Sequence, residues 1–398
     1  MMHPADHLRG TRSDKLKGRR IVLGVTGSVG AVECVKLCRD LIRNGAQVQV
    51  VMTHDAQKII HPWAMEFASG RPVIVEITGK VEHVSYCGDV PDRYDLLLIA
   101  PATANTISKM ACGIDDTPVT TFATTAIGSG MPVMVVPAMH GSMMNHKVVT
   151  ENIKTLGRLG VTFLQPKIEE SKAKMPESDY IVSSVISRIG KGDLHGIKVL
   201  VIAGATEERI DDVRVVTNKS TGETGIELAK AAYERGANLD LWMGRCDADI
   251  PGYIQTRRFS TFSDLSGMMR QVKHDVVLVP AAISDYSPKA VPGKIPSDLE
   301  SVKLLLKRNP KLIDRVKANV VVGFKAQSTK KDAELVKDAS ELLERSKCSF
   351  VVANRVADVK RGKTRVIIVN RSCDAQEIEG TKAQVAEKII DRVVELIE

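Results

Sequence analysis

Apolar runs alternate with helical stretches in the first half of the chain. "RIVLGVTGSVGAVECVKLCRDLIRNGAQVQVVMTH" (Arg20 to His54) begins with an apolar run that stops at Gly27-Ser28. The following helical stretch ends near Asn44-Gly45, a typical helix C-terminus, and a second apolar run comes after it. This order predicts a strand, a glycine-rich turn, a helix and a second strand.

The second half repeats the same order. "KVLVIAGAT" (Lys198 to Thr206) opens it, and "AKAAYERGANLDLWMG" (Ala229 to Gly244) continues it. "RNGAQVQVVM" and "ERGANLDLWM" share a helix end, Gly-Ala and a strand, and "DLLLIAPATA" corresponds to "DVVLVPAAIS". We therefore predict an α/β protein of two tandem Rossmann-like units.

The strands of both halves are apolar without interruption. Leu96–Ile99 and Val276–Val279 are typical of a mainly parallel sheet that is covered on both faces. Ligands of such sheets bind beyond the carboxyl ends of the strands, where the polar motifs lie here. The glycine-rich stretch Arg188–Gly196 predicts a short linker, so the expected domains are residues 20–190 and 191–398.

Charge and composition narrow the class of protein. The chain has 398 residues, enough for two or three domains, and a formal net charge of +8. Its basic residues are dispersed except in "KLKGRR" (Lys15 to Arg20), which predicts a solvated basic arm over residues 1–19. Only 4% of the residues are aromatic, and there is no basic helix or aromatic face, so nucleic-acid binding is not expected.

Cysteine usage indicates a reducing compartment. The seven cysteines form no C-x-x-C pair, which argues against a disulfide framework or a zinc site. No apolar run is long enough to span a membrane, and the N-terminus lacks the apolar region of a signal peptide. We expect a cytoplasmic protein that does not bind membranes.

Two turns of the first half are suited to bind phosphate. Thr26, Gly27 and Ser28 follow the first strand, and "PATANT" (Pro101 to Thr106) follows another. Each turn is either an ordinary helix N-cap or part of an anion site, because both use hydroxyls and free N–H groups. The chain has no G-x-G-x-x-G element and no acidic residue placed for an NAD ribose, which disfavours an NAD-dependent oxidoreductase.

The motifs "GVTGS", "APATANTISKMACGIDD" and "PAMHGSMM" resemble those of the flavin-dependent cysteine decarboxylases. The resemblance implies a flavodoxin-like flavoprotein domain that binds FMN and forms trimers. It also implies that His83 of "KVEHVSYCG" is the catalytic histidine. The flavin contacts that it implies are Gly27, Ser28, Thr53, Pro101, Thr103, Asn105 and Thr106.

Two positions depart from that family. His140 stands where the family usually has asparagine, although Met143 of the same motif is retained, and both are candidate substrate-binding residues. The region that corresponds to the substrate flap, Glu169–Ser178, contains no cysteine. Its Lys172 and Lys174 either bind the anionic substrate or belong to a solvated charge run. An alternative follows, in which an active ligase is fused to a structural or regulatory flavin-binding domain.

The second half resembles phosphopantothenate–cysteine ligases. The resemblance rests on "AGATEERIDDVRVVTNKSTGETG", "AAISDYSP", "GKIPS", "KRNPKLI", "VGFKAQ" and "VVANRV", in the family's order. With the first half, it implies the fused two-step enzyme of coenzyme A synthesis. Such an enzyme joins L-cysteine to 4′-phosphopantothenate with CTP, through an acyl-cytidylate. It then decarboxylates 4′-phosphopantothenoylcysteine to 4′-phosphopantetheine.

Site residues of the ligase half follow from the same motifs. Asn218 matches the asparagine that holds the acyl-cytidylate, and Lys294 matches the lysine required for activation, although Pro296 and Ser297 replace the lysines that usually follow. Asp285 is a candidate ligand of the nucleotide or of its Mg²⁺. The other candidates are Arg214, Ser220 and Thr221 for the substrate, and Phe324, Ala326 and Asn354 for the nucleotide. Ligases of this family dimerise, so the resemblance implies a homo-oligomer.

Overall fold

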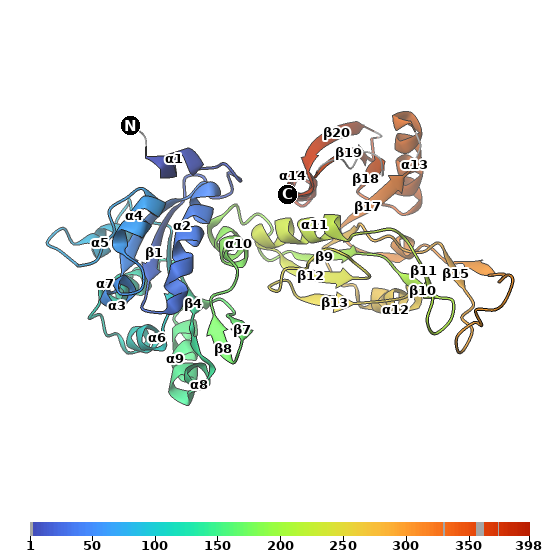
Figure 1. The fold of residues 1–398 in the computed structure, drawn as a ribbon. Coiled ribbons are helices and arrows are strands. Elements are labelled where there is room, and N and C mark those ends of the chain that lie inside the picture. The colour runs from blue at the N-terminus through green and yellow to red at the C-terminus, as the bar shows by residue number, and fades with distance from the viewer. Residues whose placement is uncertain (1–2, 329–330, 356–361, 373) are drawn as a thin grey trace. The chain divides into compact units, whose positions relative to one another are not determined.

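The computed structural model describes residues 3–328, 331–355, 362–372 and 374–398. The chain divides into two compact units, Met1–Lys191 and Gly192–Glu398. In Figure 1 the first runs from blue to green and the second from green to red. Cys373, and Val356 of "VVANRV", lie outside the described residues.

The first unit consists of strands and helices in alternation. Its strands are β1 (Arg20–Val25), β2 (Gln47–Met52), β3 (Leu96–Ala102), β4 (Val133–Pro137), β5 (Met139–His140), β6 (Thr162–Phe163), β7 (Lys167–Glu169) and β8 (Lys172–Lys174). Its helices are α1 (Pro4–Leu8), η1 (Val29–Glu33), α2 (Cys34–Arg43), α3 (His54–Gln57), α4 (Pro62–Ser69), α5 (Glu82–Cys87), α6 (Ala104–Cys112), α7 (Pro118–Gly128), α8 (Gly141–Met144), α9 (Lys147–Arg158) and α10 (Ser178–Ile189).

The main sheet of the first unit has the strand order β2-β1-β3-β4-β6, with all pairs parallel. This is the flavodoxin-like order, so that prediction is confirmed. Along β1, Ile21 and Leu23 pack with α2, α4 and α10 on one face. Val22 packs with α5, α6, α7 and α9 on the other face. Burial on both faces explains why the strand sequences are apolar throughout.

The first residues belong to this unit. Leu16 is 0% exposed, and its N–H donates to the carbonyl of Asn44, 2.8 Å away. Ala5 of α1 is buried in the same core as α2. The prediction of a solvated basic arm is therefore wrong for residues 3–19, because their few apolar side chains anchor the segment while the lysines and arginines remain at the surface.

The second unit is built around one large sheet. Its strands are β9 (Lys198–Ala203), β10 (Glu207–Arg209), β11 (Val215–Thr217), β12 (Asn238–Met243), β13 (Thr256–Arg258), β14 (Val276–Val279), β15 (Tyr286–Pro288), β16 (Leu306–Arg308), β17 (Val320–Gln327), β18 (Phe350–Arg355), β19 (Lys363–Asn370) and β20 (Ala375–Thr381). Its helices are α11 (Glu223–Glu234), α12 (Phe262–Met268), η2 (Met269–Gln271), η3 (Leu312–Arg315), α13 (Asp332–Arg345) and α14 (Lys382–Val394).

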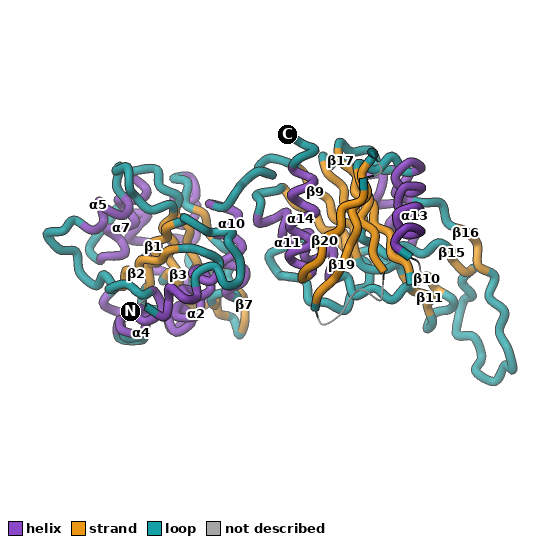
Figure 2. Tube along the Cα trace, turned by 90° about the horizontal axis from the view of Figure 1, so that it is seen from above, coloured by secondary structure: helices purple, strands orange, loops and turns teal. Residues whose placement is uncertain are grey.

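The strand order of this sheet is β13-β12-β9-β14-β17-β18-β19-β20. The first six strands are parallel and follow the Rossmann order, whereas β19 and β20 are antiparallel, so the mainly parallel sheet is confirmed. Figure 2 shows α11 and α14 on one side of the strands and α13 on the other. Two hairpins, β10–β11 and β15–β16, stand outside the sheet. Within the described residues, no helix has both the length and the apolar character needed to cross a bilayer.

Candidate active sites

The first unit has a cavity of about 670 Å³ where the strand order reverses. It is bordered by the turns that follow β1, β3 and β4, beyond the carboxyl ends of these strands. Seven of the predicted residues line it: Gly27, Ser28, Thr103, His140, Met143, Lys172 and Lys174. Segments from four parts of the sequence thus meet at the edge where parallel sheets bind ligands.

Hydroxyls hold two of these turns together. The Thr26 hydroxyl donates to the carbonyl of Pro101 at 2.8 Å and accepts from the N–H of Thr103 at 3.1 Å. The Thr103 hydroxyl then caps α6 by accepting from the N–H of Thr106 at 3.2 Å. Thr53 caps α3 in the same way, through the N–H of Ala56 at 3.2 Å. Thr53 and Thr103 therefore have structural roles as N-caps, and Thr26 joins the turns that follow β1 and β3.

Other polar groups of this region have no such role. The Ser28 side chain makes no capping bond at the start of η1, and Asn105 is exposed in the first turn of α6. Gly27 is required by packing, because a Cβ at this position would lie 2.5 Å from the Cβ of Asp55. The turn after β1 thus offers a hydroxyl and closely approachable backbone.

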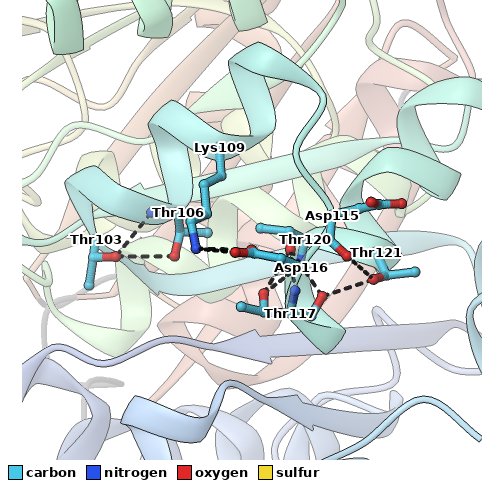
Figure 3. A network of polar contacts seen from close by, with 8 residues as sticks. All are labelled: Thr103, Thr106, Lys109, Asp115, Asp116, Thr117, Thr120 and Thr121. Atoms are coloured by element: carbon cyan, nitrogen blue, oxygen red, sulfur yellow. Dashed lines mark hydrogen bonds and ion pairs between the residues drawn. The ribbon is translucent and has the colours of Figure 1, made fainter.

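A polar network fixes the end of α6 to the start of α7 (Figure 3). Lys109 contacts both carboxylate oxygens of Asp116, at 2.9 and 2.8 Å. Thr117 and Thr120 form a capping box at the start of α7. The network holds α6, whose N-terminus borders the cavity, at a fixed place on the sheet.

The flap region forms a small antiparallel sheet of the order β5-β8-β7. His140 pairs with Lys172 across it. Lys174 binds Glu169 at 3.0 Å and Glu170 at 3.1 Å, and these hydrogen bonds raise the pKa of Lys174 and lower that of Glu169. The lysines therefore border the cavity and also take part in a surface charge network.

His83 is not among the residues that line this cavity. It lies on α5, which packs with α7 in the core on one face of the sheet. Its Nδ1 is buried and has no hydrogen-bond partner within the described chain. Within one chain, the structure does not bring His83 together with Ser28 and Thr103.

The second unit has a cavity of about 870 Å³. It is bordered by the segment before α11, by the turn after β14, and by β17 and β18. Seven predicted residues line it: Asn218, Ser220, Thr221, Asp285, Phe324, Ala326 and Asn354. This cavity also lies beside the reversal of strand order, between β9 and β14.

Hydrogen bonds from a side chain and from the backbone hold the segment before α11. The Asn218 amide donates to the carbonyl of Ala282 at 3.1 Å. The carbonyl of Thr221 accepts from two N–H groups of the loop after β12. Gly222 has a φ of +76°, and a Cβ there would lie 2.6 Å from that of Cys246. A side chain at position 222 would therefore disturb the start of α11.

Ion pairs border the second cavity. Asp285 pairs with Lys311, and Lys382 of α14 pairs with Glu223 of α11. Among the described residues, no three His, Cys, Asp or Glu side chains cluster as a metal site. Asp285 is thus a single carboxylate with a lysine partner.

Arg214 and Lys294 are not among the residues that line this cavity. The Arg214 guanidinium is 2.6 Å from Asp211 and 3.1 Å from the carbonyl of Ile295. Lys294 is exposed in the loop between β15 and β16. The two predicted residues are neighbours of each other at the β10–β11 hairpin.

Comparisons with known proteins follow the division into two units. The family profile "Flavoprotein" matches residues 9–190, and "DNA/pantothenate metabolism flavoprotein C-terminal domain" matches residues 194–397. The coenzyme A biosynthesis bifunctional protein CoaBC of Thermococcus kodakarensis is 42% identical, with 100% of both chains covered. The chain belongs to the CoaBC family. It is a bifunctional enzyme of coenzyme A biosynthesis, with a flavoprotein decarboxylase domain and a ligase domain.

A further curated relative agrees with this assignment. The CoaBC protein of Methanocaldococcus jannaschii is 34% identical and covers 100% of this chain and 98% of its own. The solved DNA/pantothenate metabolism flavoprotein from Streptococcus pneumoniae has 26% identity and a TM-score of 0.46. It covers 50% of this chain and 98% of its own.

The structure adds residues to the candidate sites of this CoaBC chain. Lys36 and Met175 line the first cavity, and Lys311, Arg345 and Lys382 line the second. Lys311 lies within the ligase motif "KRNPKLI", so a signal for it was present in the sequence. Lys382 lies on the last helix, and nothing in its sequence surroundings marks it.

Proposed function

We propose that the first unit binds FMN and decarboxylates 4′-phosphopantothenoylcysteine, and that the second joins L-cysteine to 4′-phosphopantothenate with CTP and Mg²⁺. The observation that carries the proposal is the gathering of motif residues around one cavity in each unit. Seven predicted residues line each cavity, although they come from distant parts of the sequence.

The first cavity has properties that suit FMN. Its volume of about 670 Å³ falls within the range for small-molecule sites. The obligatory glycine at position 27 and the uncommitted Ser28 hydroxyl offer a place for a phosphate, next to the start of α6. Asn105 does not line the cavity, but it is exposed in the first turn of α6, next to the lining residue Ala104, where its amide would supply a further donor and acceptor. We infer that Gly27, Ser28 and Asn105 hold the cofactor, with Thr53, Pro101, Thr103 and Thr106 shaping the turns.

FMN would supply the oxidation and reduction that make loss of the carboxylate possible. The chain's own residues would bind and orient the substrate. Lys172 and Lys174 carry positive charge at the cavity, and His140 and Met143 lie beside them, so we assign these four residues to the anionic substrate. We assign proton transfer to His83, because histidine is a common general acid and base and its Nδ1 has no hydrogen-bond partner among the described residues. In the proposed trimer, His83 would act at the cavity of another copy of the chain.

The second cavity suits a nucleoside triphosphate. Phe324, Ala326 and Asn354 offer an apolar surface and an amide for the base, and Ser220 and Thr221 precede α11, whose N-terminus favours negative charge. Asp285 would share Mg²⁺ with the phosphates, as is usual for this ion. Asn218 would hold the acyl-cytidylate with neutral donors. Arg214 would act on the substrate, and Lys294 on the charge of the activation step.

Exposed apolar side chains support a homo-oligomer. Leu299, Val302 and Leu305 lie in the loop between β15 and β16, which extends away from its sheet (Figure 2). Val213 and Val215 of the neighbouring hairpin are also exposed. We propose that this surface pairs two ligase domains and that the flavin domains form trimers. The free cysteines, among them Cys112 and Cys246, support a cytoplasmic location.

Cofactor and nucleotide can be tested on the purified protein. Heat-released cofactor should be FMN by chromatography, and pyrophosphate should form from CTP with 4′-phosphopantothenate in the presence of Mg²⁺. A colourless protein that takes up no added FMN would contradict the decarboxylase assignment. Faster turnover with ATP than with CTP would contradict the nucleotide assignment.

A further inference from the structure

The segment that carries Lys294 is bound to the β10–β11 hairpin on both sides of this lysine. The N–H of Ile295 donates to Oδ2 of Asp211 at 3.0 Å, and the N–H of Gly293 donates to Oδ2 of Asp212 at 2.9 Å. The carbonyl of Gly293 accepts from the N–H of Asp212 at 3.1 Å. The residues that flank Lys294 are thus fixed, while its side chain is exposed.

Asp211 makes the contact at Ile295. It is 2% exposed, and each of its carboxylate oxygens accepts two hydrogen bonds. Oδ1 accepts from the N–H groups of Val213 and Arg214, and Oδ2 accepts from Ile295 and from the Arg214 guanidinium. Burial alone would raise the pKa of Asp211, but these hydrogen bonds outweigh it and hold the pKa well below its usual range.

The hairpin links this contact to the second cavity. β11 connects Arg214 to Asn218, and Asn218 lines the cavity and donates to the carbonyl of Ala282. Four residues of extended chain span about 13 Å. The same hairpin therefore holds Asn218 at one end and the Lys294 segment at the other.

We propose that Asp211 is a positioning residue for Lys294. It fixes the backbone at Ile295, directly after this lysine, so that the lysine's ammonium group is presented to the ligase reaction. The proposal rests on the proposed role of Lys294 in activation. Arg214 belongs to the same arrangement, because its guanidinium bridges the Asp211 carboxylate and the carbonyl of Ile295.

If Asp211 positions Lys294, its loss should change the kcat of pyrophosphate release, whereas a purely stabilising residue would leave this kcat unchanged. In the full-length Asp211→Asn variant, the side-chain NH₂ group replaces one carboxylate oxygen and cannot accept hydrogen bonds. The hydrogen bonds of Oδ1 and Oδ2 therefore cannot all be kept, and the Lys294 segment should detach from the hairpin. We expect the kcat of pyrophosphate release without cysteine to fall between about ten- and a hundredfold, the cost of a misplaced reacting group. The KM for CTP should stay within about twofold, since Asp211 is not among the residues that line the cavity.

Two further variants make the comparison specific. Asp264→Asn is the matched control, because Asp264 also accepts N–H bonds in this unit, from Ser260 and Thr261, but does not contact the Lys294 segment. Its pyrophosphate release should remain at the wild-type rate. The double variant Asp211→Asn/Lys294→Gln should be no slower than Lys294→Gln, because residues that act as one unit are not additive.

The outcomes separate the inference from the function on which it rests. An unchanged kcat in Asp211→Asn, an equal loss in Asp264→Asn, or additive losses in the double variant would each overturn the inference. If Lys294→Gln releases pyrophosphate at the wild-type rate, the proposed role of Lys294 fails instead. Hydrogen exchange at the Ile295 amide, expected to speed up at least about tenfold in Asp211→Asn alone, then still decides whether Asp211 holds the segment.

Discussion

Polar side chains around the first cavity differ in whether they already have a partner. Thr103 caps α6 through Thr106, so its hydroxyl is used by the fold. Ser28 has no capping bond, and its hydroxyl is available to a ligand. Substitution of the two residues should therefore separate stability from cofactor binding.

Ser28→Ala should weaken FMN binding with little change in stability. A lost hydrogen bond to a charged phosphate costs about 1.5–3 kcal/mol, which raises the Kd about tenfold or more. Thr103→Ala should lower the free energy of unfolding by about 1 kcal/mol, the usual cost of an N-cap. FMN titration and urea unfolding of the apoprotein measure the two effects. Equal stability losses in both variants would contradict the distinction.

Asp211 should also make stability depend on pH. Its pKa in the folded state lies below the unfolded value of about 3.9. The full contribution of Asp211 to the free energy of unfolding is therefore present at neutral pH. The contribution declines as the pH falls below about 4, because the unfolded chain then binds the proton first. The stability difference between wild type and Asp211→Asn in urea should therefore shrink from pH 6 to pH 3. A constant difference would contradict the assigned pKa direction.

At the level of elements, turns and helix starts place the candidate residues. Gly27 lies between β1 and η1, where packing against Asp55 leaves no room for a Cβ. Gly128, at the end of α7, has no atom within 4 Å of an added Cβ. The two glycines thus form a matched pair for substitution.

Gly27→Ala should destabilise the first unit by about 1–3 kcal/mol, as overpacking does, and should weaken FMN retention. Gly128→Ala should be neutral or slightly stabilising, because alanine favours helices. Thermal unfolding and the flavin content after dialysis test both expectations. A Gly27→Ala variant that keeps wild-type stability and flavin content would contradict the role of this turn in binding the phosphate of FMN.

Much of the element pattern could be predicted from the sequence. Continuous apolar strands such as Leu96–Ile99 indicated parallel sheets. A parallel sheet is covered on both faces, so the side chains on both sides of its strands must be apolar. The pairing of β8 with β5 and β7 could not be predicted, since these strands are only two or three residues long and their sequence is charged. The course of the chain from α4 to α5, on opposite faces of the sheet, also left no local signal.

At the level of the whole molecule, the order of the motifs along the chain identified both units. It did not predict which of the candidate residues lie together in each unit. Seven of the residues predicted for each unit line one cavity, because motifs at strand ends meet at one edge of a parallel sheet. His83 lies on the short helix α5 and Lys294 lies in a loop, and the positions of both depend on tertiary packing rather than on periodicity. The basic N-terminal segment was misjudged for the same reason, since Leu16 alone does not reveal its burial.

His83→Asn should abolish decarboxylation and leave ligation intact. His83 and the second cavity belong to different compact units, so the loss should be confined to one step. Carbon dioxide release from 4′-phosphopantothenoylcysteine and pyrophosphate release from CTP measure the two activities separately. Equal loss of both activities would contradict the division of labour.

The central claim is that one chain carries out two consecutive steps. The most direct measurement incubates the purified protein with 4′-phosphopantothenate, L-cysteine, CTP and Mg²⁺ and follows the products by mass spectrometry. We predict that 4′-phosphopantothenoylcysteine appears first and is converted to 4′-phosphopantetheine, with release of carbon dioxide. Accumulation of 4′-phosphopantothenoylcysteine without release of carbon dioxide, even after addition of FMN, would contradict the claim. It would favour the alternative in which the flavin-binding domain is structural or regulatory.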